Sequence, residues 1–128
     1  MKIDLKSHVP IYVQIVEGIR AAIASGVYGP GELLPSLREL AVELHVNPNT
    51  VQKAYDGLER EGLIHSRRGL GVFVAQRGTQ SAQNQAEATV REAFRQAIRA
   101  AHAAGLTAED IRTLFEGTLE ENREKART

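Results

Sequence analysis

Two helix-start signals, separated by one short amphipathic segment, constrain the fold of this chain more than any other feature. Ser36 and Glu39 form a capping box, in which serine and glutamate bond each other's free backbone amides. The apolar spacing that follows predicts a helix that ends at the short turn 45–47. Asn47 then caps a further helix, with Pro48 at the first position because proline lacks the N–H that is unpaired there. The pattern predicts two helices joined by a tight turn, which is the spacing of a helix-turn-helix.

Further elements are predicted on both sides of this pair. An amphipathic helix begins at Pro10 and ends before Gly26. On the other side, Gly62 ends the capped helix, and two short β-runs, 63–66 and 72–75, flank a bend that contains glycines. Because glycine permits the positive φ of a tight bend, we expect a β-hairpin with a basic tip.

The C-terminal part predicts two long helices. Residues 76–85 are polar and indicate a linker or the exposed start of a helix. An alanine-rich helix then runs to a break at Gly105, and Thr107 caps a second helix. The expected fold is mostly α with a small β-hairpin. It comprises an N-terminal winged helix-turn-helix over residues 1–77 and a C-terminal two-helix dimerisation hairpin over residues 78–128.

Several classes of function lack their sequence signatures. The chain has no cysteine, and its four histidines are scattered without the spacing of a zinc site. There is no glycine-rich phosphate loop and no nucleophile motif. We therefore expect no enzyme, no metal and no cofactor. Neither a signal peptide nor a stretch long enough to span a membrane is evident, which predicts a cytoplasmic protein without a membrane partner.

The predicted second helix of the pair opens with side chains that suit DNA. The amides of Asn49 and Gln52 can bond base edges, and adenine is the natural partner of such amides. Thr50 and Lys53 suit phosphates, and Thr50 also suits a thymine methyl group. Tyr55 adds a phosphate contact if its hydroxyl reaches the surface. The alternative is a helix surface that is polar only because it faces solvent.

Two more patches favour the same interpretation. Arg67, Arg68 and Gly69 lie at the predicted hairpin tip, where a wing would reach the minor groove or the flanking backbone. Arg38 lies beside Ser36 in the first turn of a helix, where a cation is electrostatically unfavourable. An external anion such as a phosphate would explain this position, and an ion pair with a nearby glutamate is the alternative.

The charge balance leaves another alternative open. Lys and Arg together number 16, as do Asp and Glu, whereas strong non-specific binding to nucleic acid favours a basic chain. Between Gly62 and Ala86, however, there are three arginines and no acid. A winged domain that only docks on another protein, without an operator of its own, is therefore the runner-up.

The segments that carry these signals resemble the GntR family of bacterial transcription factors. The matching segments are 10–15, 29–41, 46–55 and 58–64, and the resemblance extends over residues 10–75. It implies a sequence-specific regulator, a repressor by expectation, that binds a palindromic double-stranded DNA operator as a homodimer. By resemblance, the positions that usually touch DNA are Arg38, Asn49, Thr50, Gln52, Arg68 and Gly69. Pro48 stands where many relatives carry an arginine, so we expect a different target sequence.

Residues and resemblance together give one set of candidate DNA contacts. It comprises Ser36, Arg38, Asn47, Asn49, Thr50, Gln52, Lys53, Tyr55, Arg67, Arg68 and Gly69.

The C-terminal helices are similar to those of the small YtrA subfamily. This resemblance implies a dimerisation role and regulated genes that encode transporters. Physically, two amphipathic helices cannot bury both apolar stripes alone, so a second copy is the expected partner, and folding back onto the winged domain is the alternative. The candidate dimerisation residues are Val90, Phe94, Ala97, Ile98, Ala101, Ile111, Leu114, Phe115 and Leu119. Whether a small-molecule effector binds is left open: the hairpin could enclose an apolar cavity around Phe94, Ile98, Ile111 and Phe115, but an aromatic stripe of this kind is more often core, so the sequence gives an effector no support.

Overall fold

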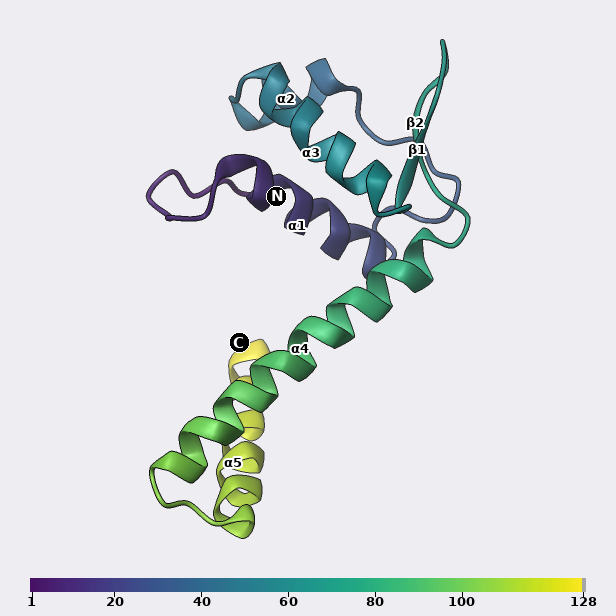
Figure 1. Ribbon diagram of the computed structural model, residues 1–128. Coiled ribbons are helices and arrows are strands. Elements are labelled where there is room, and N and C mark those ends of the chain that lie inside the picture. The colour runs from purple at the N-terminus through teal and green to yellow at the C-terminus, as the bar shows by residue number, and fades with distance from the viewer. Residues whose placement is uncertain (128) are drawn as a thin grey trace. The chain divides into compact units, whose positions relative to one another are not determined.

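The computed structural model describes residues 1–127, and over this range it contains five helices and one two-stranded sheet (Figure 1). The helices are α1 Ile11–Ala24, α2 Leu37–Leu44, α3 Pro48–Arg60, α4 Gly78–Ala103 and α5 Ala108–Arg127, and the strands are β1 Ile64–Arg67 and β2 Gly71–Val74. The predicted fold, mostly α with one β-hairpin in a winged helix-turn-helix, is confirmed. The chain forms two compact units, residues 1–87 (the winged unit) and the residues from Ala88 onward (the helical hairpin).

Both predicted helix starts of the helix-turn-helix are present. Ser36 Oγ accepts from the Glu39 amide at 3.1 Å, and the Ser36 amide donates to Glu39 Oε1 at 3.4 Å. α2 ends at His45, whose φ of 57° is left-handed and turns the chain. Asn47 Oδ1 then accepts from the Asn49 amide at 2.8 Å at the start of α3. These contacts define where α2 ends and where α3 begins.

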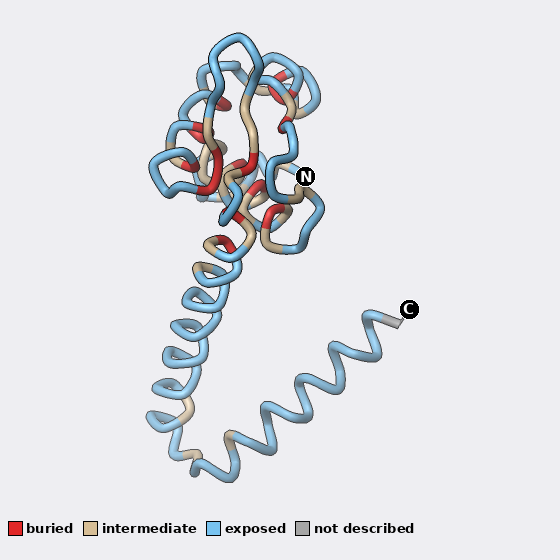
Figure 2. The backbone as a smooth tube through the Cα atoms, turned by 90° about the vertical axis from the view of Figure 1, so that its right-hand side faces the viewer, coloured by how far each residue is buried: buried red, intermediate tan, exposed pale blue. Residues whose placement is uncertain are grey.

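The core of the winged unit lies between α1 and α3. Ile15, Ile19 and Ile23 recur at helical spacing on α1 and are buried with Val51 and Leu58 of α3. Figure 2 shows that the buried residues gather in the winged unit and the first turns of α4. Large apolar side chains in such a core each contribute about 1.5–3 kcal/mol by leaving water. This packing holds the outer surface of α3 in place.

The wing, which comprises β1, the tip 68–70 and β2, is offset by one residue from the predicted strands. The sequence predicts strands over 63–66 and 72–75. In the structure β1 is Ile64–Arg67 and pairs in antiparallel register with β2, which is Gly71–Val74. Leu63 instead closes the end of α3, since its amide donates to the Leu58 carbonyl at 3.1 Å. The segment before α2, predicted as loop, also pairs with β2, because the Leu34 amide donates to the Val72 carbonyl at 2.8 Å.

The residues that follow the wing are helical and partly buried. Of the two interpretations of residues 76–85, the helix start is the one realised, because α4 begins at Gly78, but this start is not wholly exposed, since Gly78 and Ala82 are buried. Gln83 Nε2 donates to the Ala24 carbonyl at 3.0 Å and so caps the end of α1. The winged unit therefore extends into α4. The functional division after residue 77 stays a prediction.

Candidate nucleic-acid interface

The opening of α3 presents an exposed polar surface. Asn49, Gln52 and Lys53 are exposed, Thr50 is half-buried, and the first turn of α3 contains no acid. The positive end of the helix dipole lies at the same place, although the first backbone N–H groups are already used, because Pro48 has none and those of Asn49 and Thr50 donate to Asn47. This end of α3 is therefore chemically suited to a phosphate next to exposed base edges.

Two of these side chains have partners that sequence reasoning missed. Gln52 Nε2 donates to Asp56 Oδ1 at 2.7 Å, one helical turn further along α3. The Nζ of Lys53 lies 3.9 Å from the ring centroid of Tyr12 on α1, a cation–π contact. The spacing of Gln52 and Asp56 could have indicated their pairing, because residues four apart are neighbours on a helix. Nothing in the sequence places Tyr12 near Lys53.

Tyr55 does not reach the surface. Its side chain is 3% exposed, and its hydroxyl donates to the Pro35 carbonyl at 2.7 Å. Burial raises the pKa of Tyr55 well above its ordinary value, with smaller contributions from nearby Tyr28 and two glutamates. The condition under which Tyr55 would contact a phosphate is not met, so Tyr55 belongs to the core and holds the segment before α2 against α3.

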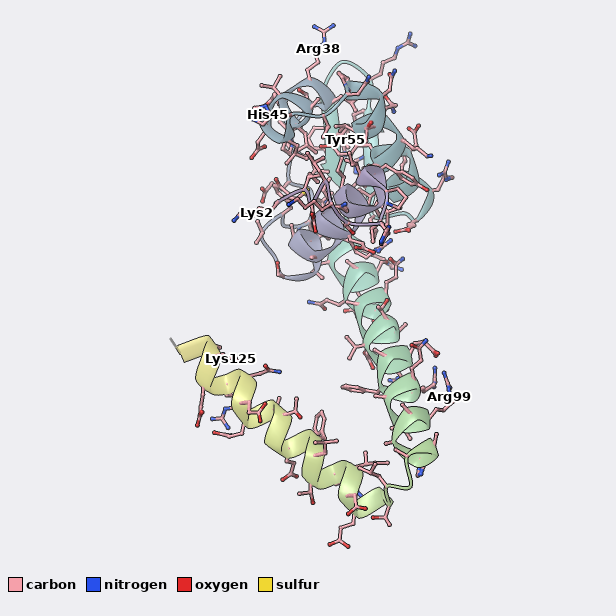
Figure 3. All side chains as sticks on the ribbon, turned by 90° about the vertical axis from the view of Figure 1, so that its left-hand side faces the viewer. Lys2, Arg38, His45, Tyr55, Arg99 and Lys125 are labelled. Atoms are coloured by element: carbon pink, nitrogen blue, oxygen red, sulfur yellow. The ribbon has the colours of Figure 1, made fainter. Side chains whose placement is uncertain are left out.

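Arg38 extends from the first turn of α2 into solvent, and Figure 3 shows it pointing away from the winged unit. Over residues 1–127, no carboxylate lies within ion-pair distance of its guanidinium. The alternative of an ion pair with a nearby glutamate is therefore not realised. Ser36, beside it, is engaged in the cap, and Asn47 has the same task at α3.

The wing positions its two arginines differently. The Arg67 guanidinium carbon lies 5.4 Å from the ring centroid of Phe73, and His65 stacks on the same ring at 6.0 Å. Arg68 and Gly69 form the exposed tip, where Gly69 has a φ of 79°. No neighbouring atom crowds Gly69, so its backbone conformation, rather than space, favours glycine. One arginine is ordered by an aromatic ring and the other extends from the tip.

The three patches come from separate elements of one unit. Arg38 lies on α2, the polar opening belongs to α3, and Arg67 to Gly69 form the end of the wing. In Figure 1 α2 and the tip of the wing lie at the upper end of the winged unit, and Figure 3 shows Arg38 at the same end.

The helical hairpin leaves its apolar side chains in solvent. Six are exposed: Val90, Phe94, Ile98, Leu114, Phe115 and Leu119. Phe94 and Phe115 meet edge to face, with ring centroids 5.9 Å apart. They line an apolar groove of about 510 Å³ together with Ala97, Ala101 and Ile111. Seven of the nine candidate dimerisation residues line this groove, and the other two, Val90 and Leu119, are exposed on α4 and α5.

Over residues 1–127, no group of three or more histidine, aspartate or glutamate side chains could hold a metal ion. In the same range no helix is long and apolar enough to cross a membrane.

Comparison with known proteins identifies close relatives. A family model described as "Bacterial regulatory proteins, gntR family" matches residues 11–74. The chain is 39% identical over 111 residues to the HTH-type transcriptional repressor YtrA of Bacillus subtilis (strain 168), covering 87% of this chain and 85% of the relative. A solved GntR family transcriptional regulator from Listeria monocytogenes is 34% identical with a TM-score of 0.77, and the alignment covers 88% of this chain and 98% of that one. The DNA-binding domain of AraR, solved in complex with operator ORX1, is 29% identical with a TM-score of 0.53, covering 59% of this chain and 99% of that one.

Proposed function

Because the chain belongs to the GntR family of bacterial regulatory proteins, and is thus a DNA-binding transcriptional regulator, we propose that it is a repressor that binds a palindromic operator as a homodimer. The observation that carries the proposal is the exposed opening of α3, which has no acid in its first turn. A similar winged domain, that of AraR, was solved on its operator, which supports the same use of this surface here.

The proposed contacts divide by chemistry. Asn49 and Gln52 bond base edges in the major groove, where amide side chains pair well with adenine. Thr50 and Lys53 contact phosphates, which adds affinity without sequence information. The unpaired Arg38 binds a phosphate or a guanine edge next to them. The remaining contacts come from the tip of the wing. Arg67 and Arg68 contact the minor groove or the DNA backbone beside it, and Gly69 allows the protein backbone to approach the DNA closely.

We propose that a second copy covers the apolar surface of the helical hairpin. Six large apolar side chains on α4 and α5 are at least 42% exposed. Burial of one such side chain contributes about 1.5–3 kcal/mol, so covering several of them with a second copy would stabilise the dimer substantially relative to the lone chain. A two-fold dimer also places two α3 helices for two half-sites of an operator. Sedimentation equilibrium tests this, and a monomer at micromolar concentration would favour a hairpin that folds back on its own winged unit.

Binding to DNA is tested with an operator obtained by selection from random sequence. The double variant Gln52→Ala, Arg68→Ala should lose at least about tenfold in affinity for this operator, since base contacts are worth about 1–3 kcal/mol each. Arg99→Ala is the matched control, because it removes one arginine of the helical hairpin that pairs with Glu92 at 3.5 Å. Unchanged affinity of the double variant would refute the proposed surface.

The second candidate function is a protein-docking module without its own operator. The zero net charge favours it, because it weakens non-specific attraction to DNA. This function predicts no salt-dependent binding to the promoter region of the chain's own gene.

The resemblance to YtrA-type regulators further leads us to propose transporter genes as targets, which the genes next to a mapped operator would test.

A further inference from the structure

An acid lies on the same face of α3 as the proposed base-reading amide. Asp56 is exposed, and over residues 1–127 its carboxylate has no cation within ion-pair distance. Its hydrogen-bond partner is Gln52, whose Nε2 donates to Asp56 Oδ1 at 2.7 Å. A carboxylate near the phosphates of DNA weakens binding to every sequence by repulsion. Its position therefore requires a compensating role.

The chemistry of the pair determines which way the Gln52 amide points. An ionised carboxylate only accepts hydrogen bonds, so the Gln52 amide must turn its NH₂ group toward Asp56. Gln52 Oε1 and the second N–H are then left for other partners. Without Asp56, the amide could rotate by half a turn, because its oxygen and nitrogen ends have nearly the same shape.

The fixed amide distinguishes the two purines. In the major groove adenine presents the N6 amino donor beside the N7 acceptor, which matches an amide oxygen beside an N–H. Guanine presents two acceptors, O6 and N7, so a fixed amide oxygen would face another acceptor. An amide that is free to rotate would instead turn its NH₂ group toward guanine and remove this conflict.

We propose that Asp56 is a positioning residue that fixes the Gln52 amide and thereby makes this regulator prefer adenine over guanine at the base that Gln52 reads. The inference rests on the proposed function, because it requires Gln52 to contact a base edge. The hydrogen bond also orders the Gln52 side chain before DNA arrives, so less conformational freedom is lost on binding.

The experiment compares Asp56→Asn with the wild type in the full chain. Fluorescence anisotropy at one salt concentration measures the dissociation constants for four duplexes that differ at one base pair. The varied base pair is the position of the operator at which the Gln52→Ala variant no longer distinguishes between bases. In Asp56→Asn, the ratio of adenine to guanine affinity should fall by about 5- to 100-fold, since asparagine accepts or donates and permits both amide orientations. Overall affinity should rise, because a negative charge is removed.

Two controls separate positioning from charge. Glu43→Gln removes an exposed acid of α2 and should leave the purine ratio unchanged. Asp56→Glu retains a carboxylate that only accepts, so it should preserve most of the preference. Circular dichroism confirms that each variant folds.

Three results would overturn the proposal. An unchanged purine ratio in Asp56→Asn, while Gln52→Ala abolishes the preference, refutes the positioning role alone. A shift caused by Asp56→Asn that persists in the Gln52→Ala background means that Asp56 reads a base directly, such as a cytosine amino group. If Gln52→Ala alters no preference at any position, the base contact itself is absent, and both this inference and the proposed contact of Gln52 fail.

Discussion

Tyr55→Phe should destabilise the winged unit without removing a DNA contact. The substitution deletes the hydroxyl that donates to the Pro35 carbonyl at 2.7 Å, and it leaves that carbonyl without its partner. This hydrogen bond is part-buried, so its loss costs about 0.5–1.5 kcal/mol. For a domain of this size, each kcal/mol lowers the melting temperature by about 4–8 °C. Thermal and urea unfolding should both show the loss.

The matched control is Tyr12→Phe, because Tyr12 is only half-buried and its hydroxyl has no hydrogen-bond partner among the described residues. This variant should leave the free energy of unfolding nearly unchanged. If Tyr55→Phe is equally neutral, the hydroxyl does not hold the segment before α2, and our account of the core at this point is wrong.

The same tyrosine predicts a pH dependence. Burial raises the pKa of Tyr55 in the folded state, so the folded state binds its proton more tightly than the unfolded state does. The resulting stabilisation is complete below the unfolded pKa of about 10 and is lost as pH rises above it. Unfolding free energies measured from pH 8 upward should therefore fall less steeply in Tyr55→Phe than in the wild type. Parallel curves would contradict the burial of the hydroxyl.

A DNA measurement separates the two roles considered for Tyr55. When Tyr55→Phe is compared with the wild type well below both melting temperatures, the dissociation constant for DNA should be unchanged. A hydroxyl–phosphate contact would instead make this variant bind all sequences about equally more weakly.

The remaining predictions concern packing, charge and assembly. Gly78→Ala should destabilise the winged unit by about 1–3 kcal/mol in thermal unfolding, because its Cβ would lie 2.8 Å from the Leu63 carbonyl oxygen, whereas Gly117→Ala, which meets no atom within 4 Å, should be neutral or stabilising. Lys53→Ala should weaken binding about equally for all DNA sequences and reduce the salt slope by about one, and a selective loss would mean that Lys53 reads a base. Phe94→Asp should convert the proposed dimer into a folded monomer in sedimentation equilibrium, and an unchanged dimer would place the interface elsewhere.

The parts of the fold that depend on neighbouring residues were predictable from sequence. The capping box of Ser36 and Glu39, the Asn47 cap and the glycine at the wing tip each rest on a few consecutive positions. The hydroxyl of Tyr55 could not be placed, because the Pro35 carbonyl that accepts from it lies twenty residues away in the sequence.

Errors arose where packing between distant segments overrides local pattern. The polar composition of residues 76–85 left a linker and an exposed helix start both open, and it did not indicate that Ala82 is fully buried. β1 begins one residue later than predicted, at Ile64, because the Leu63 amide donates to the Leu58 carbonyl at the end of α3. In the candidate interface, the contact between Arg67 and Phe73 joins two paired strands. It could not be predicted without knowing the register of β1 and β2.

Selection from random DNA by the wild-type chain tests the central claim most directly. A homodimer with one reading surface in each copy should enrich an inverted repeat whose half-site centres lie about one helical turn, roughly 10 base pairs, or a multiple of it apart. Enrichment of a single unrepeated site, or no enrichment at all, would contradict the account of a dimeric, sequence-specific repressor.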